Sequence, residues 1–164
     1  MKTSKFLVFR IGEQKLALRT NFILNIIENA KVGYRFNNET LTDENVNMLL
    51  KFKGLDIPLI KLEEKLGIKN SIHEEDKSVL VIEIQINCQP KLAGILISEV
   101  IEVVEFEDFF AFPYIPVKKT TNTDIREGII VINNESILVI NSSKIGEQNT
   151  YEFSDISKIS LYAN

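Results

Sequence analysis

The side chains best suited to metal or acid–base chemistry gather around the single histidine. His73 is followed directly by Glu74, Glu75 and Asp76. A zinc site needs several His or Cys ligands, and the one cysteine, Cys88, lies in another segment. We therefore interpret the run around His73 as a solvated charged loop, and we expect neither a metal site nor a cofactor.

Other motifs of catalytic sites are missing from the sequence. It contains no Gly-rich phosphate loop, nucleophile elbow or paired ligand motif. Glu99, Glu102 and Glu105 recur at three-residue spacing, which is typical of one solvated face. Cys88 cannot form an internal disulfide, and we interpret it as a small residue in a turn or at a strand end. We expect a protein without enzymatic activity.

Composition narrows the class of partner. The 164 residues carry a net charge of −4 with a pI near 5.2, which argues against a nucleic-acid binder that neutralises phosphates. No apolar run approaches the ~18 residues of a membrane span, so direct membrane insertion is not expected. These features predict a cytoplasmic protein.

The sequence contains an internal repeat. The matched pairs keep their order at separations between 73 and 80 residues, and they are Leu7–Phe9 with Leu80–Ile82, Leu16–Ala17 with Leu92–Ala93, Lys53–Gly54 with Asn133–Asn134, and Lys65–Gly67 with Lys144–Gly146. This pattern indicates two copies of one supersecondary unit, about residues 6–68 and 79–146, with some exchange of strands possible. Two such lobes would form a cleft for a partner. Chance alignment of aliphatic strands is the alternative.

Short strands joined by turns dominate both copies. The expected hairpins are Phe6–Ile11 with Lys15–Leu18, Met48–Phe52 with Ile57–Leu62, Val79–Ile86 with Leu92–Ile97, and Gly128–Ile132 with Ile137–Ile140. Pro58 lacks a backbone donor, which predicts an edge strand or a bulge there. Many short strands of this kind favour small antiparallel barrels, an all-β fold.

Four segments are less regular. Asn21–Glu28 suits a helical turn or a bent strand, and Glu63–Leu66 predicts one helical turn ended by Gly67. The tail 147–164 could form a short helix capped by Ser154 or Asp155. The aromatic segment Phe106–Tyr114 either packs between the lobes or forms an apolar docking surface.

Several motifs resemble the CheW-like chemotaxis adaptor family. Phe6–Gly12 with Leu16–Leu18 resembles its first hairpin, and Lys53–Gly54 with Ile57–Leu62 resembles its Asn-Leu-Arg-Gly turn and the strand that follows. Ala93–Val100 resembles its Gly-Ile-Val-Val-Asp stretch, and Gly128 with Leu138–Ile140 its last hairpin. The resemblance covers residues 4–146. It implies two five-stranded SH3-like β-barrels packed side by side around a hydrophobic groove.

The resemblance also implies a function. Family members are non-enzymatic scaffolds that couple the cytoplasmic domain of methyl-accepting chemoreceptors to the regulatory domain of the histidine kinase CheA. The residues expected at the groove are Ile23, Asn25, Ile26, Lys53, Gly54, Ile97, Ser98 and Val100. The sequence departs from the family where Lys53 replaces an Arg, Asn25 a Glu and Ser98 an Asp.

Two alternatives share this groove. One is a divergent adaptor that serves another kinase pathway. The other is a small-ligand sensor whose groove holds a metabolite, since a cleft between lobes is a common ligand site.

Overall fold

The computed structural model describes residues 3–30, 32–36, 46–68, 78–106, 110–111, 125–145 and 154–155. The charged run at His73 lies outside these residues, as do most of the aromatic segment Phe106–Tyr114 and most of the tail.

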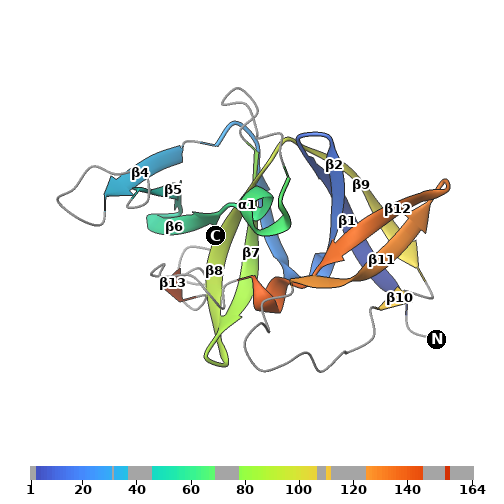
Figure 1. Cartoon of the computed structure of the whole chain (residues 1–164). Coiled ribbons are helices and arrows are strands. Elements are labelled where there is room, and N and C mark those ends of the chain that lie inside the picture. Colours follow the sequence, from blue (N-terminus) through green and yellow to red (C-terminus); the bar gives the residue numbers. More distant parts are fainter. Residues whose placement is uncertain are drawn as a thin grey trace.

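Strands make up nearly all of the regular structure (Figure 1). They are β1 (Ser4–Ile11), β2 (Gln14–Arg19), β3 (Ile23–Ile27), β4 (Val32–Phe36), β5 (Val46–Phe52), β6 (Leu55–Ile60), β7 (Ser78–Ile86), β8 (Gln89–Ile97), β9 (Glu99–Phe106), β10 (Phe110–Ala111), β11 (Arg126–Ile132), β12 (Glu135–Ile140) and β13 (Ser154–Asp155). Many of their residues are β-branched and suit a pleated surface. The predicted all-β class is confirmed.

The helical pieces are short. The helix α1 (Leu62–Leu66) ends at Gly67, whose φ of 68° is the left-handed conformation expected of a helix-ending glycine. The described part of the chain also contains two 3-10 turns, η1 (Thr20–Phe22) and η3 (Ser142–Lys144). The segment after β2 therefore combines a helical turn with a strand. None of the helices in the described part of the chain is long and apolar enough to cross a membrane.

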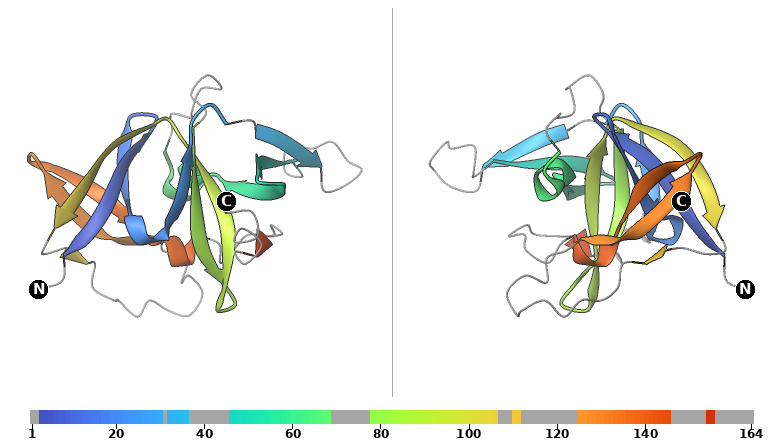
Figure 2. Two further views of the ribbon diagram at one scale, coloured as in Figure 1. Left: turned by 180° about the vertical axis from the view of Figure 1, so that it is seen from behind. Right: turned by 45° about the vertical axis from the view of Figure 1, so that its right-hand side comes forward.

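The strands form two curved sheets that lie side by side (Figure 2). One has six strands in the order β10-β11-β12-β2-β1-β9, and the other has seven, with the path β3-β7-β8-β6-β5-β4 and β13 beside β8. The expected two β subdomains are present, but with six and seven strands instead of five each. The two-residue strands β10 and β13 contribute to this excess.

Each sheet contains strands from both repeats. The hairpin β1–β2 joins β9–β12, while the equivalent hairpin β7–β8 joins β3–β6. The exchange is the same in both sheets. The first strand of each central hairpin pairs antiparallel with an outer strand, β1 with β9 and β7 with β3. The second strand of each hairpin pairs parallel with another outer strand, β2 with β12 and β8 with β6. The two halves of the sequence are therefore interlocked, and neither subdomain is one repeat by itself.

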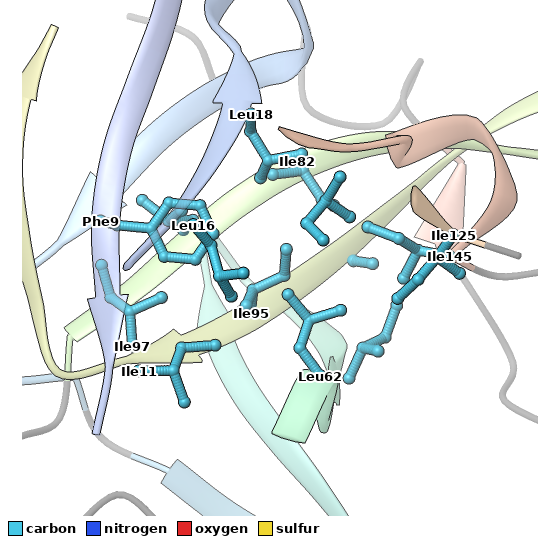
Figure 3. Close-up of a cluster of buried hydrophobic side chains, with 14 of the residues drawn as sticks. Phe9, Ile11, Leu16, Leu18, Leu62, Ile82, Ile95, Ile97, Ile125 and Ile145 are labelled. Carbon is cyan, nitrogen blue, oxygen red and sulfur yellow. The ribbon is translucent and has the colours of Figure 1, made fainter. Parts of the chain in front are cut away.

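The two hairpins are buried on both faces, which explains their nearly continuous apolar sequences. Leu7 and Phe9 of β1 face Leu80 and Ile82 of β7 in one cluster, called the central core here (Figure 3). The alternate residues point the other way, because successive side chains of a strand lie on opposite faces. Phe6 thus packs inside the first subdomain and Val81 inside the second.

The β5–β6 hairpin shows why Pro58 is tolerated. We predicted an edge strand or a bulge at Pro58. There is no register shift at Pro58, but β8 pairs only with Leu59 and Ile60, so Pro58 itself pairs with β5 alone. The edge prediction is confirmed at this position, although β6 is an inner strand from Leu59 onward. Pro58 pairs with Leu49 of β5. Bonded and non-bonded pairs alternate along an antiparallel hairpin, and counting from the Lys53–Gly54 turn makes the pair of Pro58 with Leu49 a non-bonded one. Its missing N–H is therefore not needed in that ladder.

Ser154 and Asp155 form the strand β13, which pairs antiparallel with Leu92 and Lys91 of β8. The residues expected to form a short helix after them lie outside the described residues.

Gly94 allows the close parallel contact between β8 and β6. A Cβ there would lie 3.0 Å from Val79 Cγ1 and still closer to Leu59 Cδ2, and both neighbours are buried. We predict that Gly94→Ala lowers the free energy of unfolding by roughly 1–3 kcal/mol through overpacking, measured by urea denaturation. Gly33→Ala is the control, because a Cβ there meets nothing within 4 Å. Equal stability of both variants would contradict the packing role of Gly94.

Candidate partner-binding surface

The strands β3 and β9 are equivalent edges of the two sheets. Each stands at one end of its sheet order, and each carries a bulge next to the central hairpins. The bulge leaves Leu24 unpaired in β3 and Ile101 unpaired in β9. Aligned on these bulges, Ile23–Ile27 corresponds to Val100–Val104, so the internal repeat extends through both edges.

These two edges hold most of the exposed large apolar side chains in the described part of the chain. Val103 is 59% exposed, and the other members are 37–41% exposed. The set, called the apolar edge residues here, comprises Leu24, Ile26, Val100, Ile101 and Val103. Val131 on β11 is the sixth exposed apolar residue of the described ranges. Apolar surface gathered in this way is typical of a protein–protein interface.

The predicted residues of β3 divide between surface and support. Ile26 and Asn25 are exposed, and the Asn25 side-chain oxygen accepts a hydrogen bond from the Ile26 backbone N–H at 2.8 Å. Ile23 is half-buried and packs against the central core. Ile26 can therefore contact a partner, while Ile23 mainly holds the strand in place.

Ile97 does not lie on the surface. We expected it at the groove, but its side chain is fully buried in the central core (Figure 3). As part of β8, Ile97 belongs to a hairpin covered on both faces. It supports the β9 edge from beneath and is not an exposed contact residue.

Ser98 positions the start of β9, where Val100 is exposed. The half-buried Ser98 hydroxyl accepts a hydrogen bond from the Gly12 N–H at 2.9 Å, and the Ser98 N–H donates to the Arg10 carbonyl at 2.8 Å. These two bonds attach the β8–β9 corner to the end of β1. The Ser98 hydroxyl is thus engaged within the protein.

Lys53 and Gly54 form the exposed turn between β5 and β6. Their φ angles of 48° and 78° are both positive, as a two-residue hairpin turn of type I′ requires. The Lys53 ammonium lies 5.6 Å from the centroid of the Phe52 ring. In the order of the sheet, β7 and β8 stand between the hairpin that carries this turn and β3.

The two edges differ in charge. The β3 strand carries the neutral Asn25 where β9 carries Glu102. Glu99 forms an ion pair with Arg10 at 3.0 Å, whereas Glu102 and Glu105 are exposed and have no ion-pair partner among the described residues. The two equivalent apolar strands therefore present different electrostatic surroundings.

Sequence reasoning missed Leu24, Ile101 and Val103. The available signal was the repeat itself, since carrying the match of Leu16–Ala17 with Leu92–Ala93 onward brings the two edge strands into correspondence to within one residue. Within the described ranges, no group of three or more His, Cys, Asp or Glu residues could hold a metal ion.

Ile97 and Val100 were both expected at the groove, but only Val100 is exposed. We predict that Ile97→Asp prevents stable folding, because it places an unpaired carboxylate in the central core, at a cost of several kcal/mol. Val100→Asp should stay folded, because Val100 is 37% exposed. Circular dichroism during thermal unfolding measures both. A cooperative transition for Ile97→Asp close to that of the unaltered protein would contradict this placement.

The comparisons with known proteins agree with this architecture. The family model of the CheW-like domain matches residues 5–149. Among solved structures, the chain is similar to the scaffolding protein TtCheW from Thermoanaerobacter tengcongensis, with a TM-score of 0.67 and 24% sequence identity over 92% of this chain and 97% of that chain. This likeness shows the fold. A comparison with curated proteins finds no match.

The family match covers most of the chain, including both central hairpins and both apolar edges. CheW-like proteins are non-catalytic scaffolding adaptors of chemotaxis signal transduction, in agreement with the expectation of no enzymatic activity. The chain therefore belongs to the CheW-like domain family.

Proposed function

We propose that this protein is a cytoplasmic adaptor that couples the cytoplasmic domain of a chemoreceptor to the regulatory domain of the histidine kinase CheA. The observation that carries the proposal is the pair of equivalent edge strands, β3 and β9, with exposed apolar residues in a CheW-like domain. An adaptor needs two surfaces that can be occupied together. In this proposal the two edges, which belong to different sheets, provide these surfaces.

Side chains, more than the backbone, should provide the contacts. The bulges at Leu24 and Ile101 interrupt both edges, and a bulged edge is a poor template for adding a strand. In this proposal a receptor surface covers the exposed aliphatic side chains. The proposed contact region consists of Ile23, Asn25, Ile26, Lys53, Gly54, Ser98 and Val100, with Leu24, Ile101 and Val103 added from their exposure.

The β3 edge offers a direct test of receptor binding. We predict that Ile26→Asp weakens binding of the chemoreceptor cytoplasmic domain by roughly 30-fold, corresponding to about 2 kcal/mol for a central apolar anchor. Val131→Asp is the matched control, since Val131 is 45% exposed against 39% for Ile26 but lies on β11. Isothermal titration calorimetry with each folded variant measures the effect.

The Val131→Asp control distinguishes lost apolar contact from added negative charge. If Ile26→Asp binds the receptor domain as tightly as the unaltered protein, β3 is not the receptor-binding edge. If Val131→Asp weakens binding equally, the effect comes from added negative charge and not from lost apolar contact.

The Lys53 turn should contribute less. A Lys ammonium acts as a point charge, and an exposed charge at the rim of an interface contributes about 0.5–1 kcal/mol. We predict that Lys53→Ala weakens receptor binding about two- to fivefold at low salt and less at high salt. Lys53→Arg, which keeps the charge, should bind at least as well. Complete loss of binding in Lys53→Ala would place the main contact at the turn.

A further inference from the structure

The strand β13 occupies a part of β8 that the rest of its sheet leaves uncovered. On this side of β8, the parallel partner β6 pairs only with Gly94 and Ile95. Nearer the hairpin turn, Ser154 pairs with Leu92 and Asp155 with Lys91 (Figure 1). The matched family domain ends at residue 149, so β13 comes from outside the region shared with the family.

The hairpin geometry shows which backbone groups β13 satisfies. The turn at Asn87–Cys88 is flanked by Ile86 and Gln89, which form a hydrogen-bonded pair. Along an antiparallel hairpin without a register shift, bonded and non-bonded pairs alternate, so the pair of Glu83 with Leu92 is a non-bonded one. Leu92 therefore points its N–H and C=O away from β7. Pro90, two residues earlier on the same side, has no N–H to pair.

The side chain of Leu92 is fully buried in the cluster inside the second subdomain, which fixes the orientation of its backbone. The outward N–H and C=O of Leu92 therefore stay at the edge of β8, and an uncovered strand edge invites pairing with another extended chain. Leu92 thus offers a pairing position for a strand beside β8.

The first sheet covers the equivalent position differently. Counted from the hairpin turns, Ala17 of β2 is the counterpart of Leu92, and it pairs with Val139 of β12. In the second sheet β6 pairs only from Gly94 onward, two positions beyond Leu92. The gap at Leu92 arises from this difference between the repeats, and β13 fills it.

We propose that the tail is a removable edge strand: residues 154–155 close a slot on β8 at Leu92 that accepts one extended segment at a time. Because the pairing of the described tail residues covers two positions, few hydrogen bonds hold this strand, and another extended segment can displace it. The tail then acts as an internal competitor for any partner that adds a strand to β8.

Two proline variants of the full chain separate backbone pairing from other effects. The pair Ser154–Leu92 is the bonded one, so Ser154→Pro removes a needed donor, whereas the Asp155 N–H points away from β8. We expect hydrogen exchange of the Leu92 amide, followed by NMR, to speed up at least tenfold in Ser154→Pro and to stay within about twofold in Asp155→Pro. Unchanged exchange in Ser154→Pro, or equal acceleration in both variants, would overturn the proposal.

The slot is then tested in trans with a labelled synthetic peptide of residues 150–160. We expect saturable binding to the Ser154→Pro protein by fluorescence anisotropy, and at least tenfold weaker binding to the unaltered protein, whose own tail fills the slot. Binding should also restore slow exchange of the Leu92 amide. Equal binding to both proteins, or binding to neither, would show that β8 has no such slot.

Discussion

The fold depends on two hairpins that must be covered on both faces. The β1–β2 and β7–β8 hairpins pack against each other in the central core and turn their other faces to two smaller clusters. Each fully buried aliphatic side chain contributes roughly 1.5–3 kcal/mol, so this doubly buried layer supplies much of the stability. The outer face of neither hairpin is covered by strands of its own repeat.

This requirement accounts for the exchange of strands. Each hairpin takes its outer cover from the other half of the chain, so β9–β12 close over β1–β2 and β3–β6 close over β7–β8. The interlocked halves place β3 and β9 at corresponding edges, where their apolar residues remain exposed. The proposed docking surfaces are therefore a consequence of how the core is completed.

Much of the local structure was readable from the residues. The four hairpins, the helical turn ended by Gly67 and the match between the two halves all follow from apolar runs broken by turn residues. Errors arose where pairing with distant strands decides. Ile97 was expected at the groove but is fully buried, because β8 pairs with β7 on one side and with β6 on the other, and these partners cannot be inferred from neighbouring residues.

In the candidate site too, pairing with distant strands decides what the local sequence leaves open. Ile97 and Val100 both appear in aliphatic runs, yet one is fully buried and the other is 37% exposed, because β8 lies inside its sheet and β9 lies at an edge. By itself the sequence determined the all-β class, the repeat and the family resemblance, since strand periodicity and turn chemistry are local properties. Only the tertiary structure decided which strands cross between repeats and which apolar residues face solvent, because burial depends on strands brought together from distant parts of the chain.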